Sequence, residues 1–238
     1  MRRLLAASLL LLMGAPALGA SAELGEVERL VARRTNEFRA DHGLARLEPD
    51  AALDRAAQAF AEFMARNDRY GHAADGRTPS DRAKAQGYDF CLVSENISYQ
   101  FSTEGFGTEE LARRYVEGWK ASPGHRANML EPHAVHMAQA VARSARTGRY
   151  YGVQMFGRPR SRSIEFRVTN AARAPVRYRV GAEEFTLRAA QERVHTLCAP
   201  ETVTFAEAAN AEGRTFRPSG GERLRVEGDK RLVVRSER

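Results

Sequence analysis

The chain has 238 residues and a formal net charge of +7, with 43% hydrophobic and 28% charged residues. This length allows one large domain, or a medium domain with a small second one. Arginine carries the basicity, because Lys84, Lys120 and Lys230 are the only lysines. Acidic residues are interleaved with the basic ones, which is typical of a solvated surface and argues against a nucleic-acid-binding protein.

The first 22 residues have the pattern of a secretory signal peptide. Arg2 and Arg3 precede an apolar run that ends in small residues, with a cleavage site after Ala22. The run is shorter than the roughly 20 residues of a membrane-spanning helix, and no other segment is long and apolar enough. We expect a secreted or periplasmic protein with no transmembrane segment after cleavage and no nucleic-acid partner. Its remaining charge of +5 matches an anionic envelope surface, either lipid or polysaccharide.

Three helices are predicted next. Residues 24–41 carry apolar side chains at the spacing of one helical face. Asp50 is placed to cap a second helix that ends near Asn67. The polar loop RYGHAADGR then leads to a short helix over residues 78–87, which the capping signals of TPSD open and a glycine closes.

A mixture of strands and helices follows. LVSENISYQF, residues 92–101, reads as a strand because it is rich in β-branched and aromatic residues. A helix over residues 108–121 places Tyr115 and Trp119 on one face, where core packing explains them. MAQAVA and YYGVQMF predict a hairpin. Interleaved elements of this kind indicate an α+β layered domain, which we assign to residues 23–159.

The sequence changes character near residue 160. Residues 160–238 contain short alternating segments, among them SIEFRVTN, PVRYRV, EFTLR, VTF, RLRV and RLVV, separated by Asn, Gly, Pro and charged residues. This pattern predicts a small all-β accessory domain, either a sandwich or a barrel. Cys91 and Cys198 both lie in the exported part, where they either form a disulfide or remain small buried side chains; the sequence leaves both open.

Three residues of the first domain are candidates for chemistry. His72 lies in the YGHAADG loop, Glu95 in the SENIS strand, and His125 in the first turn of a helix that Ser122 is expected to cap with its side chain. Two imidazoles and a carboxylate suit an open site for zinc or another divalent cation, and without metal they suit a general base with its orienting partner. Their spacing matches no short metal motif. A joint site and three separately satisfied polar residues therefore both remain open.

An ordered set of motifs resembles one family. NEFRADHGLARLEPDAALDRAA, YGH, TPSDRAKAQGY, SENIS, WKASPGHRANML and AQAVA with YYGVQMFG follow one another over residues 28–157 as in the bacterial form of the CAP superfamily, also called the SCP domain. The resemblance implies a three-layer α-β-α sandwich with a cleft of two histidines and two acidic residues, proposed in the family to bind a divalent cation such as zinc. It implies His72 and His125 as the cleft histidines and metal ligands, and Glu95 as one acid.

The second acid of the family pattern is missing. Many members carry it three residues after the tryptophan, where this chain has Ser122. Glu117 is a poor substitute, because it projects about 140° away from position 122 around a helix. The incomplete set puts metal affinity and hydrolytic chemistry in doubt.

Three functions remain open, and the sequence does not decide whether the protein is an enzyme. The first is an exported protein whose cleft binds a lipid, a peptide or an envelope polymer, with or without a divalent cation. The second is a peptidase-like hydrolase that uses the same cleft, in which water is activated by a bound metal or by a histidine and His72, Glu95 or His125 acts as the base. The third is an envelope-binding protein that acts through its basic C-terminal β domain.

Overall fold

The structure, a computed structural model, describes residues 22–208 and 215–236. The signal peptide expected over residues 1–22 lies, apart from Ala22, outside the described residues. Among those that are described, no helix is both long and apolar enough to cross a bilayer.

The first domain is built on a four-stranded sheet in the order β1-β3-β4-β2. The strands β2 and β3 both pair antiparallel with β4, while β1 runs parallel to β3. In this order β2 is an edge strand, which leaves one of its sides open to the residues of the site. The bounds are β1 (Glu48–Pro49), β2 (Phe90–Gln100), β3 (His136–Arg143) and β4 (Tyr150–Pro159).

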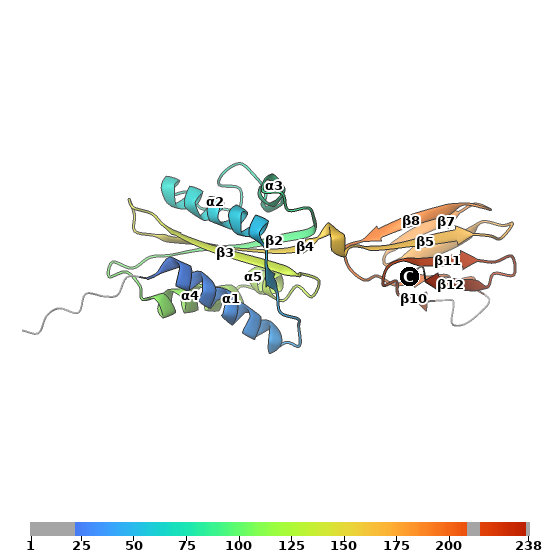
Figure 1. The fold of residues 1–238 in the computed structure, drawn as a ribbon, viewed down its shortest axis with the longest axis horizontal. Coiled ribbons are helices and arrows are strands. Elements are labelled where there is room, and N and C mark those ends of the chain that lie inside the picture. The colour runs from blue at the N-terminus through green and yellow to red at the C-terminus, as the bar shows by residue number, and fades with distance from the viewer. Residues whose placement is uncertain (1–21, 209–214, 237–238) are drawn as a thin grey trace, which may run out of the picture.

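Helices cover both faces of this sheet (Figure 1). The helices α1 (Leu24–Ala40), α4 (Thr108–Ala121) and α5 (Pro123–Met129) lie on one face. The helices α2 (Ala51–Asn67) and α3 (Pro79–Ala85) lie on the other. Each face has its own apolar core, and the three layers confirm the predicted α-β-α sandwich.

The helix boundaries follow the predicted signals, with one exception. Asp50 accepts hydrogen bonds from the backbone of Ala52 and Leu53 (2.8 and 3.0 Å), and Thr78 forms a capping box with Asp81. Tyr115 and Trp119 are buried in the core, as expected. Ser122 stands at the start of α5, but its side chain forms no capping hydrogen bond there. The predicted side-chain cap is therefore wrong, and Pro123 supplies the start signal alone, since its fixed φ suits a first helical turn.

The chain after β4 passes through a short 3₁₀ turn, η1 (Arg160–Arg162), and the described residues beyond it form eight strands arranged as two sheets. One sheet has the order β12-β11-β5-β8 and the other β10-β9-β6-β7. Inward-facing side chains, among them Phe166, Tyr178 and Leu224, form one core, so this part is a small sandwich. The strands are β5 (Ile164–Asn170), β6 (Val176–Val180), β7 (Glu183–Leu187), β8 (Glu192–Leu197), β9 (Val203–Thr204), β10 (Thr215–Phe216), β11 (Glu222–Val226) and β12 (Leu232–Ser236).

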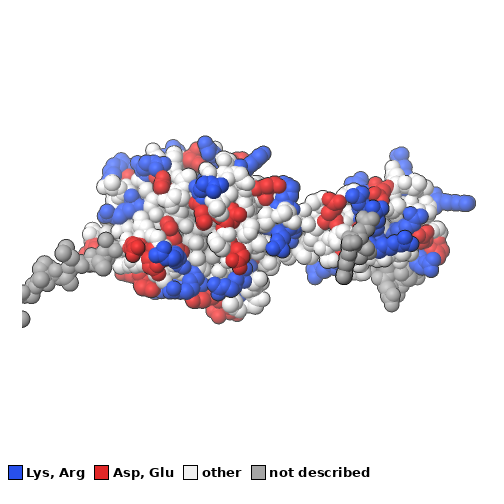
Figure 2. Space-filling view, viewed as in Figure 1, with Lys and Arg blue, Asp and Glu red and all other residues white. Residues whose placement is uncertain are grey.

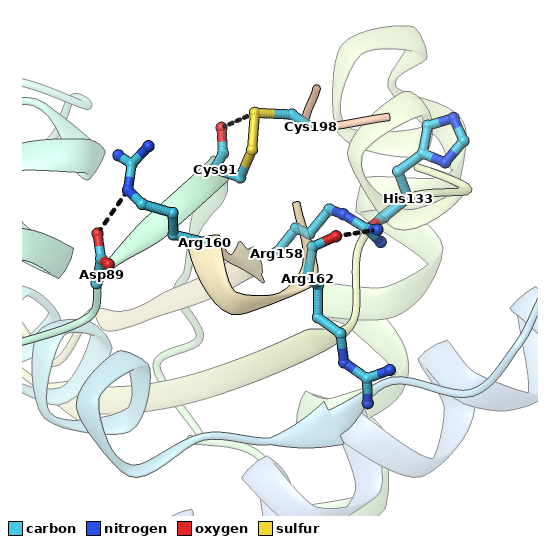
Figure 3. The surroundings of a disulfide bond; sticks show 7 residues. All are labelled: Asp89, Cys91, His133, Arg158, Arg160, Arg162 and Cys198. Carbon is cyan, nitrogen blue, oxygen red and sulfur yellow. Dashed lines mark hydrogen bonds and ion pairs between the residues drawn. A yellow bond between two sulfur atoms is a disulfide. The ribbon is translucent and has the colours of Figure 1, made fainter. Parts of the chain in front are cut away.

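A disulfide between Cys91 and Cys198 joins the two parts of the chain (Figure 3). The sequence left open whether these two cysteines are bonded or are separate buried side chains, and in the structure they are bonded. Cys91 lies in β2, four residues before Glu95, and Cys198 directly follows β8. Beside it, Arg160 pairs with Asp89 at 3.0 Å. The strand that carries the site is thus covalently linked to the β sandwich.

Candidate functional site

The site lies at the open edge of β2, where His72 contacts Glu95. Nδ1–H of His72 donates to Oε1 of Glu95 over 2.8 Å. The Glu95 side chain has no exposed surface, whereas the side chain of His72 is 51% exposed. The hydrogen bond fixes the ring and leaves its Nε2 atom for a ligand at the surface.

Arg82 holds the buried carboxylate from behind. Its Nη2 atom donates to both oxygens of Glu95, at 2.9 and 2.8 Å, and to the carbonyl of His72 at 2.9 Å. Its Nη1 atom donates to Asp75 at 2.8 Å, and the guanidinium lies 3.5 Å from the centre of the Phe60 ring. Arg82 therefore compensates the charge of Glu95 and fixes the loop that carries His72.

Arg82 was not predicted from the sequence, although a signal for it exists. In the segment that forms α3, only the capping residues carried a prediction. A carboxylate inside a half-buried strand needs a cation nearby, because an unpaired buried charge is costly. The structure meets this need with Arg82, which is itself only 4% exposed and lies on the inner side of α3.

His125 reaches the same edge from the other face of the sheet. Its carbonyl accepts a hydrogen bond from Asn96 at 3.1 Å, and Asn128 donates to the carbonyl of Glu95 at 3.2 Å. Burial lowers the pKa of His125, and the charge of His72 lowers it further. The hydrogen bonds place His125 beside β2 at Glu95 and Asn96, so the structure brings His72, Glu95 and His125 to one place.

Exposed aromatic rings extend the site along β2. The hydroxyl of Tyr70 donates to the carbonyl of Ile97 at 3.2 Å, and the rings of Tyr70 and Tyr99 meet edge to face at 5.2 Å. Tyr70 is 49% exposed and Tyr99 43% exposed. Because Tyr70 and Asn128 occupy edge carbonyls of β2, this edge is closed to an added strand and open to side-chain recognition.

The residues present do not fit a zinc centre. Both oxygens of Glu95 already accept from Arg82, and Nδ1 of His72 is bonded to Glu95. What remains is Nε2 of His72 and the ring of His125, which together offer two protein ligands, whereas zinc sites use three or four. Across the described ranges, no group of three or more His, Cys, Asp or Glu side chains is placed to hold a metal ion.

Ser122, the hydroxyl nearest in sequence to His125, is not an activated nucleophile. The hydroxyl of Ser122 makes no hydrogen bond to any residue that the structure describes, so no base is in contact with it. Glu117, the predicted poor substitute for the missing acid, instead pairs with Lys120 at 3.0 Å on the exposed side of α4. The arrangement can hold a ligand by hydrogen bonds and by contact with exposed rings.

Comparison with known proteins gives a consistent assignment. The model of the cysteine-rich secretory protein family, CAP, matches residues 32–156. Two uncharacterized proteins of Bacillus subtilis are similar: the membrane protein YlbC, 32% identical over 49% of this chain and 32% of its own length, and YkwD, 29% identical over 52% and 46%. The chain thus spans less than half of either relative. An outer surface protein of Borrelia burgdorferi shares the fold, with 20% identity, a TM-score of 0.51, and coverage of 59% of this chain and 98% of that one.

Proposed function

The chain belongs to the CAP family, and we propose that it is exported and binds a polymer of the bacterial cell envelope through the open edge of β2, without a metal ion. The observation that carries this proposal is the double hydrogen bond from Arg82 to Glu95. It commits the carboxylate that contacts His72 to an internal role. His72 and His125 are then left as hydrogen-bonding groups for a ligand.

The exposure of the site favours a polymer over an enclosed small molecule. Half of the His72 side chain is open to solvent, and so are the neighbouring rings of Tyr70 and Tyr99. Ligand pockets for small molecules bury most of their ligand. A shallow edge with imidazole hydrogen bonds and exposed aromatic faces suits instead a sugar or peptide segment that lies along the surface.

Hydrolysis in the same cleft is the weaker alternative. It is supported by the His72–Glu95 hydrogen bond, because a carboxylate that orients an imidazole is a common feature of general bases. However, both oxygens of Glu95 also accept hydrogen bonds from Arg82, so the carboxylate is committed to a buried structural pair. Without an adjacent nucleophile the geometry favours binding over catalysis.

The charge distribution supports a second contact with the envelope. Residues 23–159 contain 19 Lys or Arg against 19 Asp or Glu, whereas residues 160–238 contain 16 against 11. The whole positive excess of the exported chain thus lies in the β sandwich. Figure 2 shows acidic and basic side chains mixed over the first domain and basic side chains prominent over the second. The sandwich would attract anionic polymers or lipids while the cleft supplies specificity.

Cosedimentation of the mature chain with purified peptidoglycan sacculi tests the proposal. We expect His72→Ala and Tyr99→Ala to reduce binding several-fold, and His133→Ala, which removes an imidazole away from the cleft, to leave it unchanged. Replacing Arg225 and Arg235 by Gln tests whether the β sandwich contributes to binding. If it does, the double variant should bind more weakly, and its binding should depend less on the salt concentration. Undiminished binding by the His72 and Tyr99 variants would exclude the cleft.

A further inference from the structure

A cavity opens at the end of the β sandwich that lies farthest from the cleft. It has a volume of about 360 Å³ and is formed by residues 171–177, the segment around Phe205 and the turn between β11 and β12. The strands β5 and β11 run away from the first domain toward this end (Figure 1). The cavity is therefore independent of the His72 site, and its volume lies at the lower end of the range for small-molecule pockets.

The floor of this cavity is apolar and belongs to the sandwich core. Phe205, Val226 and Ala172 line it, with exposed fractions of 2%, 4% and 7%. Phe205 stacks on Tyr178 with ring centres 5.3 Å apart. An apolar group that entered would contact the packed core and lose contact with water.

The walls are held in place without a ligand. Asn170, which is fully buried, donates from Nδ2 to the carbonyls of Ala174 and Leu187, at 2.9 and 3.0 Å. Its Oδ1 atom accepts from the backbone of Ala172 at 2.8 Å. One buried side chain thus fixes the turn that forms one wall, so the cavity is formed in advance and binding orders little of the chain.

The rim carries an excess of positive charge. Of the described residues that line the cavity, Arg173, Arg177 and Lys230 are basic and Glu207 is the single acid. Hydrogen bonds from Lys230 and Arg177, at 3.1 and 3.2 Å, lower the pKa of Glu207 and keep it ionised. Arg173 is exposed, and no described residue pairs with its guanidinium. The rim therefore has a net charge of +2 and one arginine that is free to receive an anion.

We propose that this cavity binds an anionic amphiphile, specifically a carboxylate with a medium-length acyl chain. The chain would enter the space above Phe205 and Val226, and the carboxylate would pair with Arg173 at the rim. Arginine suits this role because its planar fork donates two parallel hydrogen bonds to a carboxylate. The inference does not depend on the function proposed for the cleft, because no residue is shared between the two sites.

Calorimetric titration of the mature chain with decanoate, kept below its critical micelle concentration, tests this proposal. Ala174 lines the cavity from an exposed position, so Ala174→Trp fills the space without disturbing the core. We expect this variant to weaken decanoate binding at least about tenfold. Arg173→Ala should weaken it about three- to tenfold, as expected for a charge-assisted hydrogen bond at a partly exposed rim.

Two comparisons make the result specific. Arg188→Ala removes an exposed arginine of the same domain that lies outside the cavity, and it should leave the dissociation constant unchanged. Decanol and inorganic phosphate, which each carry half of the proposed chemistry, should bind more weakly than decanoate. Equal binding of decanoate and decanol would overturn the proposed pairing of the carboxylate with Arg173. Full binding by Ala174→Trp, or no binding by the unmodified chain, would overturn the site itself.

Discussion

Arg82 and Glu95 form a buried ion pair in which one guanidinium nitrogen donates to both carboxylate oxygens, at 2.9 and 2.8 Å. The side chain of Arg82 is 4% exposed and that of Glu95 is fully buried. The pair connects α3 to β2, and through His72 it determines where the cleft imidazole points. The exposed edge of β2 that carries the candidate site is thus positioned by a buried ion pair.

Removing the guanidinium of Arg82 should strongly lower the stability of the protein. Arg82→Met leaves the buried charge of Glu95 without its guanidinium, with only the hydrogen bond from His72, and we expect the free energy of unfolding to fall by about 3–5 kcal/mol. Urea unfolding followed by circular dichroism measures this loss. Arg66→Met is the matched control, because Arg66 pairs with Glu62 on the surface of α2. An exposed pair of this kind contributes about 0–1 kcal/mol.

The double variant Arg82→Met/Glu95→Met completes the cycle. Removing both charges also removes the uncompensated carboxylate, so the double variant should be more stable than Arg82→Met alone. Additive losses in the two single variants would show instead that the side chains act independently. That result would contradict the conclusion that the two charges compensate each other.

The few side chains left as metal ligands lead to a prediction about the effect of zinc on thermal unfolding. A site that bound zinc only in the folded state would gain about 2.7 kcal/mol at a hundred times the dissociation constant. Because Arg82 holds both oxygens of Glu95 and only the two imidazoles remain as ligands, we expect excess zinc to leave the unfolding midpoint of the metal-free mature protein unchanged. A rise that both His72→Ala and His125→Ala abolish would contradict this, and would show that Arg82 releases Glu95 to the metal.

Local signals allowed most of the first domain to be predicted. Asp50, Thr78 and Asp81 act as caps at the expected positions, because capping depends on residues close in sequence. The same logic failed at Ser122, where α4 ends and α5 begins on one residue whose backbone already accepts a hydrogen bond from Arg126. The side chain there is not needed to define the helix start.

Features that depend on contacts between distant parts of the sequence could not be predicted from such local signals. Arg82 and Glu95 are 13 residues apart and meet only because α3 packs on β2. The strand β8 was missed as well, since ERVHTL begins with two charged residues and shows no regular alternation of buried positions. It is a strand because it pairs with β5, so tertiary contacts determine its structure.

The disulfide should contribute measurably to stability. It closes a segment of 107 residues, and removal of a native disulfide typically costs about 2–5 kcal/mol. We expect a loss of this size in Cys91→Ser/Cys198→Ser and an equal loss in the reduced unmodified chain. Mass spectrometry after alkylation is the accompanying measurement. Labelling of two thiols in the denatured chain without prior reduction would show that the bond does not form in the protein.

Gly152 occupies a position where no side chain fits. A methyl group there would overlap the ring of Tyr115, which is fully buried and held by a hydrogen bond from its hydroxyl to the carbonyl of Tyr150 at 2.7 Å. Gly152→Ala should therefore destabilise the protein by about 1–3 kcal/mol. Gly118→Ala, at an open and exposed position of α4, should instead stabilise it by up to about 1 kcal/mol. Thermal unfolding of the two variants tests the opposite signs.

The β sandwich contains a buried histidine that should make its stability depend on pH. His195 is 8% exposed, stacks on Phe166 with ring centres 4.9 Å apart, and lies 2.8 Å from the hydroxyl of Tyr178. Burial lowers its pKa below the ordinary value of 6.5, with a further contribution from Arg193. The unfolded chain therefore binds more protons at His195 than the folded chain between the lowered pKa and 6.5. Stability is fully present above 6.5 and is lost as the pH falls toward the lowered pKa.

His195→Gln separates this effect from the titration of other groups, because glutamine keeps a hydrogen-bonding group near Tyr178 but does not titrate. Between pH 7 and pH 5, denaturant unfolding of the sandwich should show a larger loss of stability in the unmodified chain than in the variant. The difference between the two curves should flatten below the folded pKa of His195. Parallel curves over this range would mean that folding does not change the proton affinity of His195, and that the packed ring accepts its charge without cost.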